Sequence, residues 1–349
     1  MVSIFVQGRE IGPSQSCFVI AELGVNHNGS LDLALQLVDA AVGAGADAVK
    51  FQTFKAERLV MSSAPKARYQ LQTTDKEETQ MQMLSKLELS RDAHLKLQDY
   101  CRQKKILFLS TPFDEESADF LNEIGIPAFK VSSGDLNNWP FLIHVAKKGK
   151  PLLLSTGMSD LEEVKKASEA IFKTGNSQLV LLHCVSNYPA DPADVNLKAL
   201  RTLMDSTGLS VGYSDHTAGI EISLGAVALG ACVIEKHFTL SRAMPGPDHK
   251  ASLEPRDFAA LTAGIRSIEK ALGSGIKAPA ASEQENRRIV RKSLVAACDI
   301  VVGAALNQAM LIALRPGDGI SPSELENVLT RKTKKSLKRG DQISWEHLE

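Results

Sequence analysis

Polar and charged side chains lie in or directly after several short apolar runs of the sequence. Glu22 lies near the end of the run 17–23, and Lys50 and Gln52 lie two residues apart in the run 48–54. Because residues two apart in a strand point to the same face, Lys50 and Gln52 share a face. A lysine inside an apolar strand is costly to bury as a cation without an anionic partner. Carboxylates, amides and cations in this arrangement can bind an anionic substrate and transfer protons to it.

Lys130 is a second lysine within an apolar run, 128–133. Two interpretations are open for Lys50 and Lys130: each pairs with a neighbouring carboxylate as a structural ion pair, or both hold one anion such as a phosphate. Hydroxyl groups at the ends of other runs favour the anion, because they add hydrogen-bond donors around it. These hydroxyl groups belong to Ser110, Thr111, Ser132, Ser133, Ser155, Thr156 and Ser214.

Two histidines, His216 and His237, lie at the ends of the last two apolar runs. A single histidine at a strand end is often only hydrogen-bonded within the protein. Two imidazoles beside Glu22, Glu235 and Asp248 favour a divalent metal site. Oxygen ligands and water suit Mn²⁺, Co²⁺ or Mg²⁺ better than structural zinc, which prefers a closed shell of four protein ligands. Such a metal would polarise a carbonyl group as a Lewis acid.

Eight apolar, β-rich runs must position these side chains. They are 17–23, 48–54, 106–111, 128–133, 151–156, 179–185, 209–214 and 232–238. Most are apolar on both faces, which is typical of a buried parallel sheet. The segments between them have helical character. In 31–43 apolar residues recur at helical spacing, with Ser30 as the predicted N-cap and glycines at the end.

Eight strand–helix repeats predict an α/β fold, a (β/α)8 TIM barrel, whose catalytic groups lie at the carboxyl ends of the strands. A doubly wound open sheet is the competing fold, but it usually has a Gly-rich turn after its first strand. The gap 54–106 is long. We expect its polar part, 68–79, to be an inserted loop over the barrel mouth, followed by a helix.

The composition changes near residue 274. We expect a TIM-barrel catalytic domain over 1–274, a linker over 275–289 and a small domain of short strands and turns over 290–349. The linker is predicted by its Gly, Pro and Ala content. The stretch 331–339 holds six basic residues in nine, and we interpret it as a solvated face.

The charge balance and the cysteines exclude several classes of protein. Forty Lys+Arg and 41 Asp+Glu give a net charge of -1, which argues against a general nucleic-acid binder. No apolar run is long enough to span a membrane, and the N-terminal residues do not resemble a secretory signal. The 5 cysteines are scattered and never in Cys-x-x-Cys spacing, which predicts reduced thiols and a cytoplasmic protein.

Long motifs around these residues resemble the sialic acid (N-acetylneuraminate) synthase family. The motifs are residues 20–29, 48–54, 212–217, 234–239 and 246–250. The similarity runs nearly end to end, and residues 314–320 look like part of the antifreeze-like (SAF) C-terminal domain of that family.

The resemblance implies a transferase that condenses phosphoenolpyruvate with an open-chain N-acylated aminosugar and water, with C–O cleavage. With N-acetylmannosamine the products are N-acetylneuraminate and phosphate. His216 and His237 would hold the metal, most simply Mn²⁺, which binds the sugar aldehyde. Glu22 and Glu235 would position water and move protons.

The resemblance also assigns the substrate contacts. Phosphoenolpyruvate would lie among Lys50, Thr111, Lys130, Ser133, Ser155 and Ser186. The sugar would face Gln52, Tyr188 and Asp248, and Ser214 is a further substrate-binding candidate. The family forms homodimers in which the antifreeze-like domain of one chain caps the barrel of the other, so Arg315 would reach the N-acyl group in trans.

Three alternatives accompany this prediction. Legionaminic acid synthases, which use a 6-deoxy-2,4-diacetamido hexose, share almost every motif, and Ser186 and residues 69–74 depart from some sialic acid synthases. A Schiff-base aldolase would use a strand lysine, namely Lys50, Lys130 or Lys236. A non-catalytic sugar-binding or ice-binding protein would keep the fold without the reaction.

Overall fold

The structure is a computed structural model that describes residues 2–349. It divides into two compact units, Met1–Gly273 and Ser274–Glu349. Each unit has its own apolar core and is described separately.

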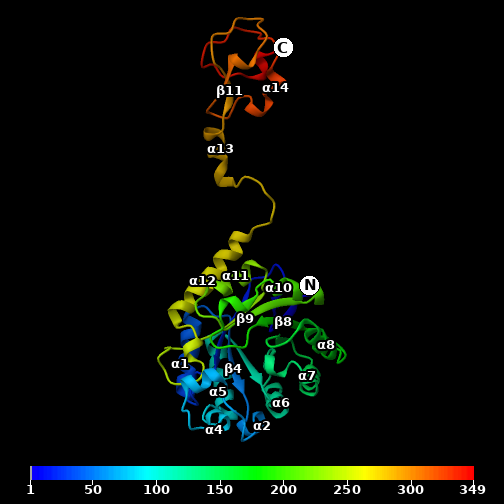
Figure 1. Ribbon diagram of the computed structural model, residues 1–349, viewed down its shortest axis with the longest axis vertical. Coiled ribbons are helices and arrows are strands. Elements are labelled where there is room, and N and C mark those ends of the chain that lie inside the picture. The colour runs from blue at the N-terminus through cyan, green and yellow to red at the C-terminus, as the bar shows by residue number, and fades with distance from the viewer. Residues whose placement is uncertain (1) are drawn as a thin grey trace. The chain divides into compact units, whose positions relative to one another are not determined.

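Eight parallel strands form a closed barrel in the first unit, in the order β10-β3-β4-β5-β6-β7-β8-β9 (Figure 1). The strands are β3 (Phe18–Gly24), β4 (Ala48–Thr53), β5 (Leu107–Pro112), β6 (Phe129–Val131), β7 (Leu152–Ser155), β8 (Leu179–Cys184), β9 (Ser210–Asp215) and β10 (Val233–His237). The predicted TIM barrel is therefore confirmed, and each strand overlaps one predicted run. The strand β6 is shorter than predicted because Ser133–Asp135 turns into a 3-10 helix.

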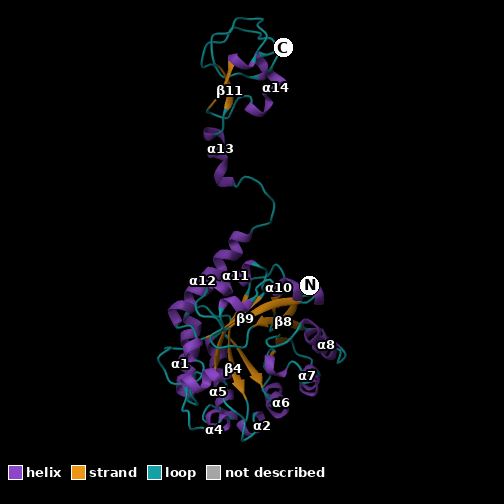
Figure 2. Ribbon diagram, in the orientation of Figure 1, coloured by secondary structure: helices purple, strands orange, loops and turns teal. Residues whose placement is uncertain are grey.

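Helices surround these strands, as Figure 2 shows. The longer ones are α1 (Leu31–Gly43), α5 (Arg91–Lys104), α6 (Glu115–Glu123), α7 (Trp139–Ala146), α8 (Leu161–Phe172), α10 (Ala199–Thr207), α11 (Glu221–Ala228) and α12 (Pro255–Leu272), and α9 (Pro192–Val195) is a short turn. The helix α1 has the predicted bounds, and the Ser30 side chain accepts a hydrogen bond from the Leu33 N–H as its N-cap. Its apolar stripe packs in the core between strands and helices.

An N-terminal hairpin, β1 (Ile4–Val6) and β2 (Arg9–Ile11), precedes the barrel and was not predicted from the sequence. Its buried side chains, Ile4, Val6 and Ile11, pack against residues inside the barrel such as Phe18 and Val233. Both of these residues lie at the amino ends of their strands. The amino end of the barrel is thus filled with apolar side chains, and a polar site must open at the carboxyl ends of the strands.

The long gap between β4 and α5 forms three short helices, α2 (Ala56–Leu59), α3 (Arg68–Thr73) and α4 (Gln80–Ser85). Helices follow the expected loop 68–79, as predicted, but the loop itself contains α3. Met83 and Leu87 pack with Val25 and Phe54, which follow β3 and β4. This segment, residues 56–87, is called the cover segment below.

The second unit contains α13 (Gln284–Val290), the antiparallel pair β11 (Ser293–Ala296) and β12 (Leu311–Leu314), and α14 (Leu325–Val328). All of α13 except its last residue, Val290, lies within residues 275–289, where we expected only a linker. The Ala280 N–H donates to the Glu283 carboxylate at 2.7 Å and caps the turn before α13. In the basic stretch 331–339, Lys338 is 77% exposed beside Asp299, as a solvated face requires. Within residues 2–349, no helix is both long and apolar enough to cross a membrane.

Candidate active site

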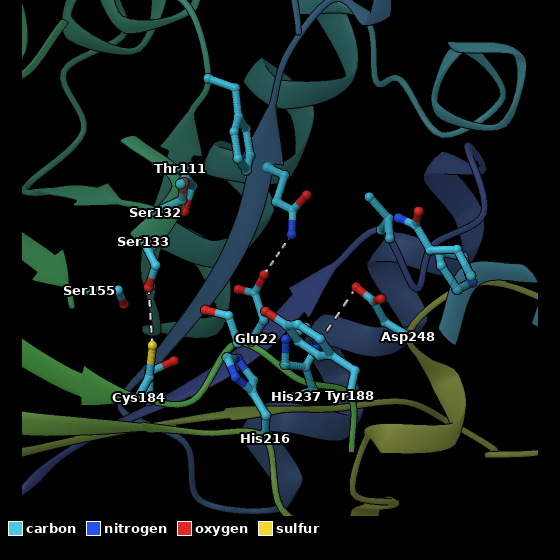
Figure 3. Close-up of a pocket in the computed structure, with 18 of the residues that line it drawn as sticks. Glu22, Thr111, Ser132, Ser133, Ser155, Cys184, Tyr188, His216, His237 and Asp248 are labelled. Carbon is cyan, nitrogen blue, oxygen red and sulfur yellow. Dashed lines mark hydrogen bonds and ion pairs between the residues drawn. The ribbon is translucent and has the colours of Figure 1, made fainter. Parts of the chain in front are cut away.

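A cavity of about 430 Å³ opens at the carboxyl ends of the barrel strands (Figure 3). The predicted site residues that line it are Glu22, Lys50, Gln52, Thr111, Lys130, Ser133, Ser155, Ser186, Tyr188, Ser214, His216, Glu235, His237 and Asp248. Arg315 is the one predicted site residue that does not line it, because Arg315 belongs to the second unit. The barrel brings these side chains together from strand ends that are far apart in the sequence.

Two lysines and two glutamates form a buried charge cluster at the floor of the cavity. Lys50 Nζ lies 2.6 Å from Glu22 Oε2 and 3.8 Å from Glu235 Oε2, and Lys130 Nζ lies 3.6 Å from Glu235 Oε1. All four side chains expose 5% of their surface or less. The two interpretations of the lysines are thus compatible, because these ion pairs line the cavity that an anion would enter.

Neutral side chains hold this cluster in place. Lys50 donates to Thr111 Oγ1 at 3.0 Å, and Gln52 donates to Glu22 Oε1 at 3.1 Å. Ser214 donates to Glu235 Oε1 at 2.9 Å. Thr111, Gln52 and Ser214 therefore orient the charged groups as well as lining the cavity.

The environments of the two glutamates move their pKa values apart. Burial raises the pKa of Glu22, and attraction to Lys50 offsets only part of that rise. Burial also acts to raise the pKa of Glu235, but the cations of Lys130 and Lys50 outweigh it and lower the pKa. Such a divergence is typical of an acid and a base that act in one site.

Small hydroxyl groups gather beside Lys130. The Gly157 N–H donates to Ser133 Oγ at 2.9 Å, and Ser133 Oγ lies 3.1 Å from Cys184 Sγ. Within residues 2–349, the buried Ser155 Oγ has no hydrogen-bond partner. A side chain at Gly157 would collide with Ser133, Cys184 and Ser186. The result is a small polar recess, suited to the oxygens of an anion.

The two predicted metal-binding histidines lie side by side (Figure 3), with ring centroids 5.4 Å apart. His216 Nδ1 lies 2.7 Å from the carbonyl oxygen of Val185. Donation from Nδ1 to that carbonyl leaves the lone pair on Nε2 of His216. Burial lowers the pKa of His216 to about 4 and that of His237 well below its usual value, so both rings are neutral near pH 7.

The ring nitrogens of His216 and His237 are suitable donors for a divalent cation. In the part of the chain that the structure describes, the buried His237 Nδ1 has no hydrogen-bond partner, and Asp248 Oδ2 is 3.8 Å from it. No group of three or more His, Cys, Asp or Glu suited to a metal occurs in residues 2–349. Two neutral imidazoles would leave the other coordination positions to substrate oxygens and water, as the chemistry of Mn²⁺ or Mg²⁺ favours.

Aromatic rings connect the histidines to the cover segment. The ring of Tyr188 lies 4.1 Å from that of His216 and 4.9 Å from that of Tyr69, between ring centroids. Thr73 of α3 donates to the carbonyl oxygen of Pro247 at 3.4 Å. The cover segment therefore forms one wall of the cavity.

Asp248 lies in the lining of the same cavity. Burial raises the pKa of Asp248 to about 7, and the nearby charge of Glu22 raises it further.

The expected segment over the barrel mouth, 68–79, contains two residues of this wall, Tyr69 and Gln70, but sequence reasoning missed the others. The missed residues are Leu59, Val60, Gln80, Met83, Leu84 and Leu87, and Val25 and Phe113 continue the wall from the ends of β3 and β5. The only signal for the missed residues was the length of the gap between the second and third strands. Their apolar members follow no regular spacing that distinguishes a cavity wall from a core.

Known proteins are similar to this chain over nearly its whole length. The model of the NeuB family matches residues 37–277, and the model of the SAF domain matches residues 291–349. The N,N'-diacetyllegionaminic acid synthase of Legionella pneumophila is 50% identical over 97% of this chain and 96% of its own length. The enzyme of the same name from Campylobacter jejuni is 51% identical over 93% of this chain and 98% of its own.

A solved structure is similar over most of this chain. The N-acetylneuraminic acid synthetase of Leptospira borgpetersenii serovar Hardjo-bovis, crystallised with citrate, is 38% identical with a TM-score of 0.74. The alignment covers 82% of this chain and 95% of that chain.

Proposed function

The chain belongs to the NeuB family of nonulosonic acid synthases, and we propose that its aminosugar is a 6-deoxy-2,4-diacetamido hexose, which makes it a legionaminic acid synthase. Two relatives of that name share about half of the sequence over nearly the whole chain. The N-acetylneuraminic acid synthetase is more distant, at 38% identity. These identities favour the diacetamido sugar. The sequence motifs alone had favoured N-acetylmannosamine.

The lining of the cavity supports the same sugar. The cover segment presents Leu59, Val60, Met83, Leu84 and Leu87 to the cavity. A 6-deoxy-2,4-diacetamido hexose carries three methyl groups, one at C6 and one in each acetamido group. N-acetylmannosamine carries only one, and it has hydroxyl groups at C4 and C6. Burial of a methyl group against an apolar wall is favourable, whereas a hydroxyl group buried without a partner is costly.

The charge cluster supplies the groups for binding phosphoenolpyruvate. Lys130 and the recess of Ser133, Ser155 and Ser186 would hold phosphate or carboxylate oxygens, with Ser155 Oγ already free of partners among the described residues. Lys50 adds a second cation, oriented by Thr111. Binding both substrates in one cavity holds their reacting atoms close together and in a fixed orientation, which lowers the entropic cost of the reaction.

The reaction forms one C–C bond and, at C2, replaces one C–O bond by another. C3 of phosphoenolpyruvate attacks the sugar aldehyde at C1, and the aldehyde oxygen gains a proton. Water forms a bond to C2 and loses one proton. Phosphate then leaves with the bridging oxygen and takes up the second proton of the water, which gives a 2-keto acid. A divalent metal held by His216 and His237 would supply Lewis acidity toward the aldehyde oxygen.

Glu22 and Glu235 suit the two proton transfers. Glu22, whose pKa is raised, is the residue to hold a proton and give it to the oxygen formed from the aldehyde. Glu235, whose pKa is lowered, remains a carboxylate and can take a proton from the attacking water. Ser214 keeps Glu235 oriented for this role through its hydrogen bond to Oε1.

A homodimer completes the proposal. In it, the second unit of one chain would cap the barrel of the other, and the exposed Arg315 would bind the N-acyl group of the sugar in trans. Capping would exclude water from the reactive intermediate.

Two of the three strand lysines do not suit a Schiff-base aldolase, whereas burial lowers the pKa of the third, Lys130. A Schiff base needs a neutral amine, yet the carboxylates of Glu22 and Glu235 overcome burial and raise the pKa of Lys50. Lys236 does not line the cavity.

Phosphate release from phosphoenolpyruvate tests the proposal directly. The full chain is assayed with Mn²⁺ and either 2,4-diacetamido-2,4,6-trideoxymannose or N-acetylmannosamine. The proposal predicts phosphate release with the first sugar at a much higher kcat/KM than with the second. Release with N-acetylmannosamine alone would restore the sialic acid assignment, and release with neither sugar would reject the synthase.

A further inference from the structure

A second buried ion pair lies just behind the two histidines and outside the cavity. Lys236 Nζ of β10 is 2.8 Å from Asp215 Oδ2 of β9, and neither side chain has any exposed surface. Neither residue lines the cavity, whereas Ser214, His216, Glu235 and His237 all do. The alternation of side chains along a strand explains this difference, because Asp215 and Lys236 point to the outer face of the barrel.

Both charges have several hydrogen-bond partners in this position. Asp215 Oδ1 accepts hydrogen bonds from the N–H of Thr217 at 2.8 Å and from its hydroxyl at 2.7 Å. Asp215 Oδ2 accepts a hydrogen bond from Ser223 Oγ of α11 at 2.5 Å. Lys236 Nζ donates to the carbonyl oxygen of Thr217 at 2.6 Å. The network joins the ends of β9 and β10 to the loop that follows β9.

Asp215 and Lys236 lie at the same height along the barrel axis, on neighbouring strands. Asp215 and Lys236 are register partners, with their Cα atoms directly opposite each other in adjacent parallel strands. Each immediately precedes one of the two histidines, His216 or His237. The distance between these two backbone positions therefore determines how far apart the imidazole rings can lie.

Hydrophobic burial does not account for such a pair. Taking two charges out of water is costly, and apolar residues of similar volume often stabilise a fold as well or better. Other residues of the core in this part of the fold, such as Ala226 and Val227 of α11, are apolar. A charge pair adds something that apolar packing does not, namely a fixed distance and register between two strand ends.

We infer that Asp215 and Lys236 are positioning residues that hold His216 and His237 at the separation needed to bind one divalent cation. This inference rests on the metal site of the proposed function. Groups behind metal ligands typically change metal affinity by about ten- to a hundredfold when they are removed. The pair touches neither the substrates nor the metal, so its effect is exerted through the backbone of β9 and β10.

The test measures Mn²⁺ affinity without turnover. The dissociation constant of the full chain for Mn²⁺ is measured from the electron paramagnetic resonance signal of free Mn²⁺, and circular dichroism reports folding. The variants are Lys236→Met and the double variant Asp215→Asn with Lys236→Met. The amide introduced by Asp215→Asn would keep an acceptor for Thr217 and a donor for Ser223, and the double variant leaves no buried charge without a partner. Val227→Ala, which removes packing from α11, is the control for lost stability.

The inference predicts that both pair variants fold and that their dissociation constants for Mn²⁺ rise about ten- to a hundredfold. Val227→Ala should change the affinity for Mn²⁺ less than either of the two pair variants does. A folded double variant with the affinity of the parent would overturn the inference. So would a double variant that fails to fold, because the pair would then serve folding, or a Val227→Ala chain that loses equal affinity.

His216→Ala separates this inference from the proposed function. If the parent binds no more Mn²⁺ than His216→Ala, the metal site and the role of the pair are both rejected. Phosphate release with the two sugars still reports independently on the reaction.

Discussion

Lys50 Nζ lies 2.6 Å from Glu22 Oε2, and the two side chains expose 4% and 2% of their surface. The pair forms across β3 and β4, where Glu22 and Lys50 are register partners. It places a cation beside a carboxyl group of raised pKa in the lining of the cavity. In the proposed function this cavity would receive a phosphate ester and an aldehyde.

Glu22→Gln should abolish most turnover and leave the fold intact. The amide keeps the size of the side chain but cannot deliver a proton, so phosphate release should fall about a hundredfold or more. Glu88→Gln is the matched control, since Glu88 pairs with Lys55 at 2.6 Å outside the cavity. A Glu22→Gln chain with the kcat of the parent would remove Glu22 from the proposed chemistry.

His216→Ala and His237→Ala should each lose metal-dependent turnover, because each removes one of two neutral imidazole donors. The metal content of dialysed protein, measured by elemental mass spectrometry, should fall with activity. His183→Ala is the control, because His183 also bonds a backbone carbonyl at 2.7 Å but lies outside the cavity. Full metal content in His216→Ala would contradict the assignment.

Leu84→Gln should shift the choice of sugar. Leu84 lines the cavity from the cover segment, and an amide there replaces part of the apolar wall. We expect kcat/KM for the 6-deoxy-2,4-diacetamido hexose to fall about tenfold more than that for N-acetylmannosamine, in line with the effect of one misplaced apolar group. Met158→Gln, at an exposed position of the lining, should leave the ratio unchanged. An unaltered ratio in Leu84→Gln would count against the apolar wall as the determinant of specificity.

The unliganded chain should lose stability as the pH falls from 6.5 toward 4. Burial lowers the pKa of His27 and His216 from 6.5 to about 4, so across this range the unfolded chain binds protons that the folded chain excludes. The free energy of unfolding therefore falls with pH, by up to about 3 kcal/mol per histidine. Asp248 has the opposite effect, because its pKa is raised from 3.8 to about 7 and the folded chain takes up its proton first as the pH falls. This offsets only part of the loss of stability.

Urea unfolding at a series of pH values measures how steeply the free energy of unfolding depends on pH. His27→Asn should make this dependence on pH weaker, because it removes one of the buried histidines. A slope that is the same in the parent and in His27→Asn would show that this buried histidine does not control acid stability.

Mixing two inactive chains tests capping in trans. Glu22→Gln lacks the proton donor, and Arg315→Ala should bind the sugar weakly while it still binds phosphoenolpyruvate. If Arg315 acts on the partner's barrel, mixed dimers regain one intact site, and the mixture should recover about a quarter of the parental activity. Activity no higher than the average of the two variants would place Arg315 outside the partner's site.

The barrel and the floor of its cavity could be predicted from the sequence. Runs that are apolar on both faces indicated the parallel strands, and parallel strands bring their carboxyl ends to one rim. That geometry alone gathers Glu22, Lys50, His216 and His237. The identity of each side chain then indicated anion and metal chemistry.

The cover segment could not be predicted in the same way. Tyr69 reaches Tyr188 through a ring contact between segments more than a hundred residues apart in the chain. The helices α3 and α4 are too short for a periodic pattern to identify them, and tertiary contacts decide their fold. The hairpin of β1 and β2 was missed for the same reason, since three-residue strands give almost no alternation.

A competition between the two sugars tests the central claim most directly. The full chain with Mn²⁺ and phosphoenolpyruvate receives equal amounts of 2,4-diacetamido-2,4,6-trideoxymannose and N-acetylmannosamine, and mass spectrometry measures both nine-carbon products. The account predicts that the diacetylated product predominates from the first turnovers. A product mixture dominated by N-acetylneuraminate would contradict it.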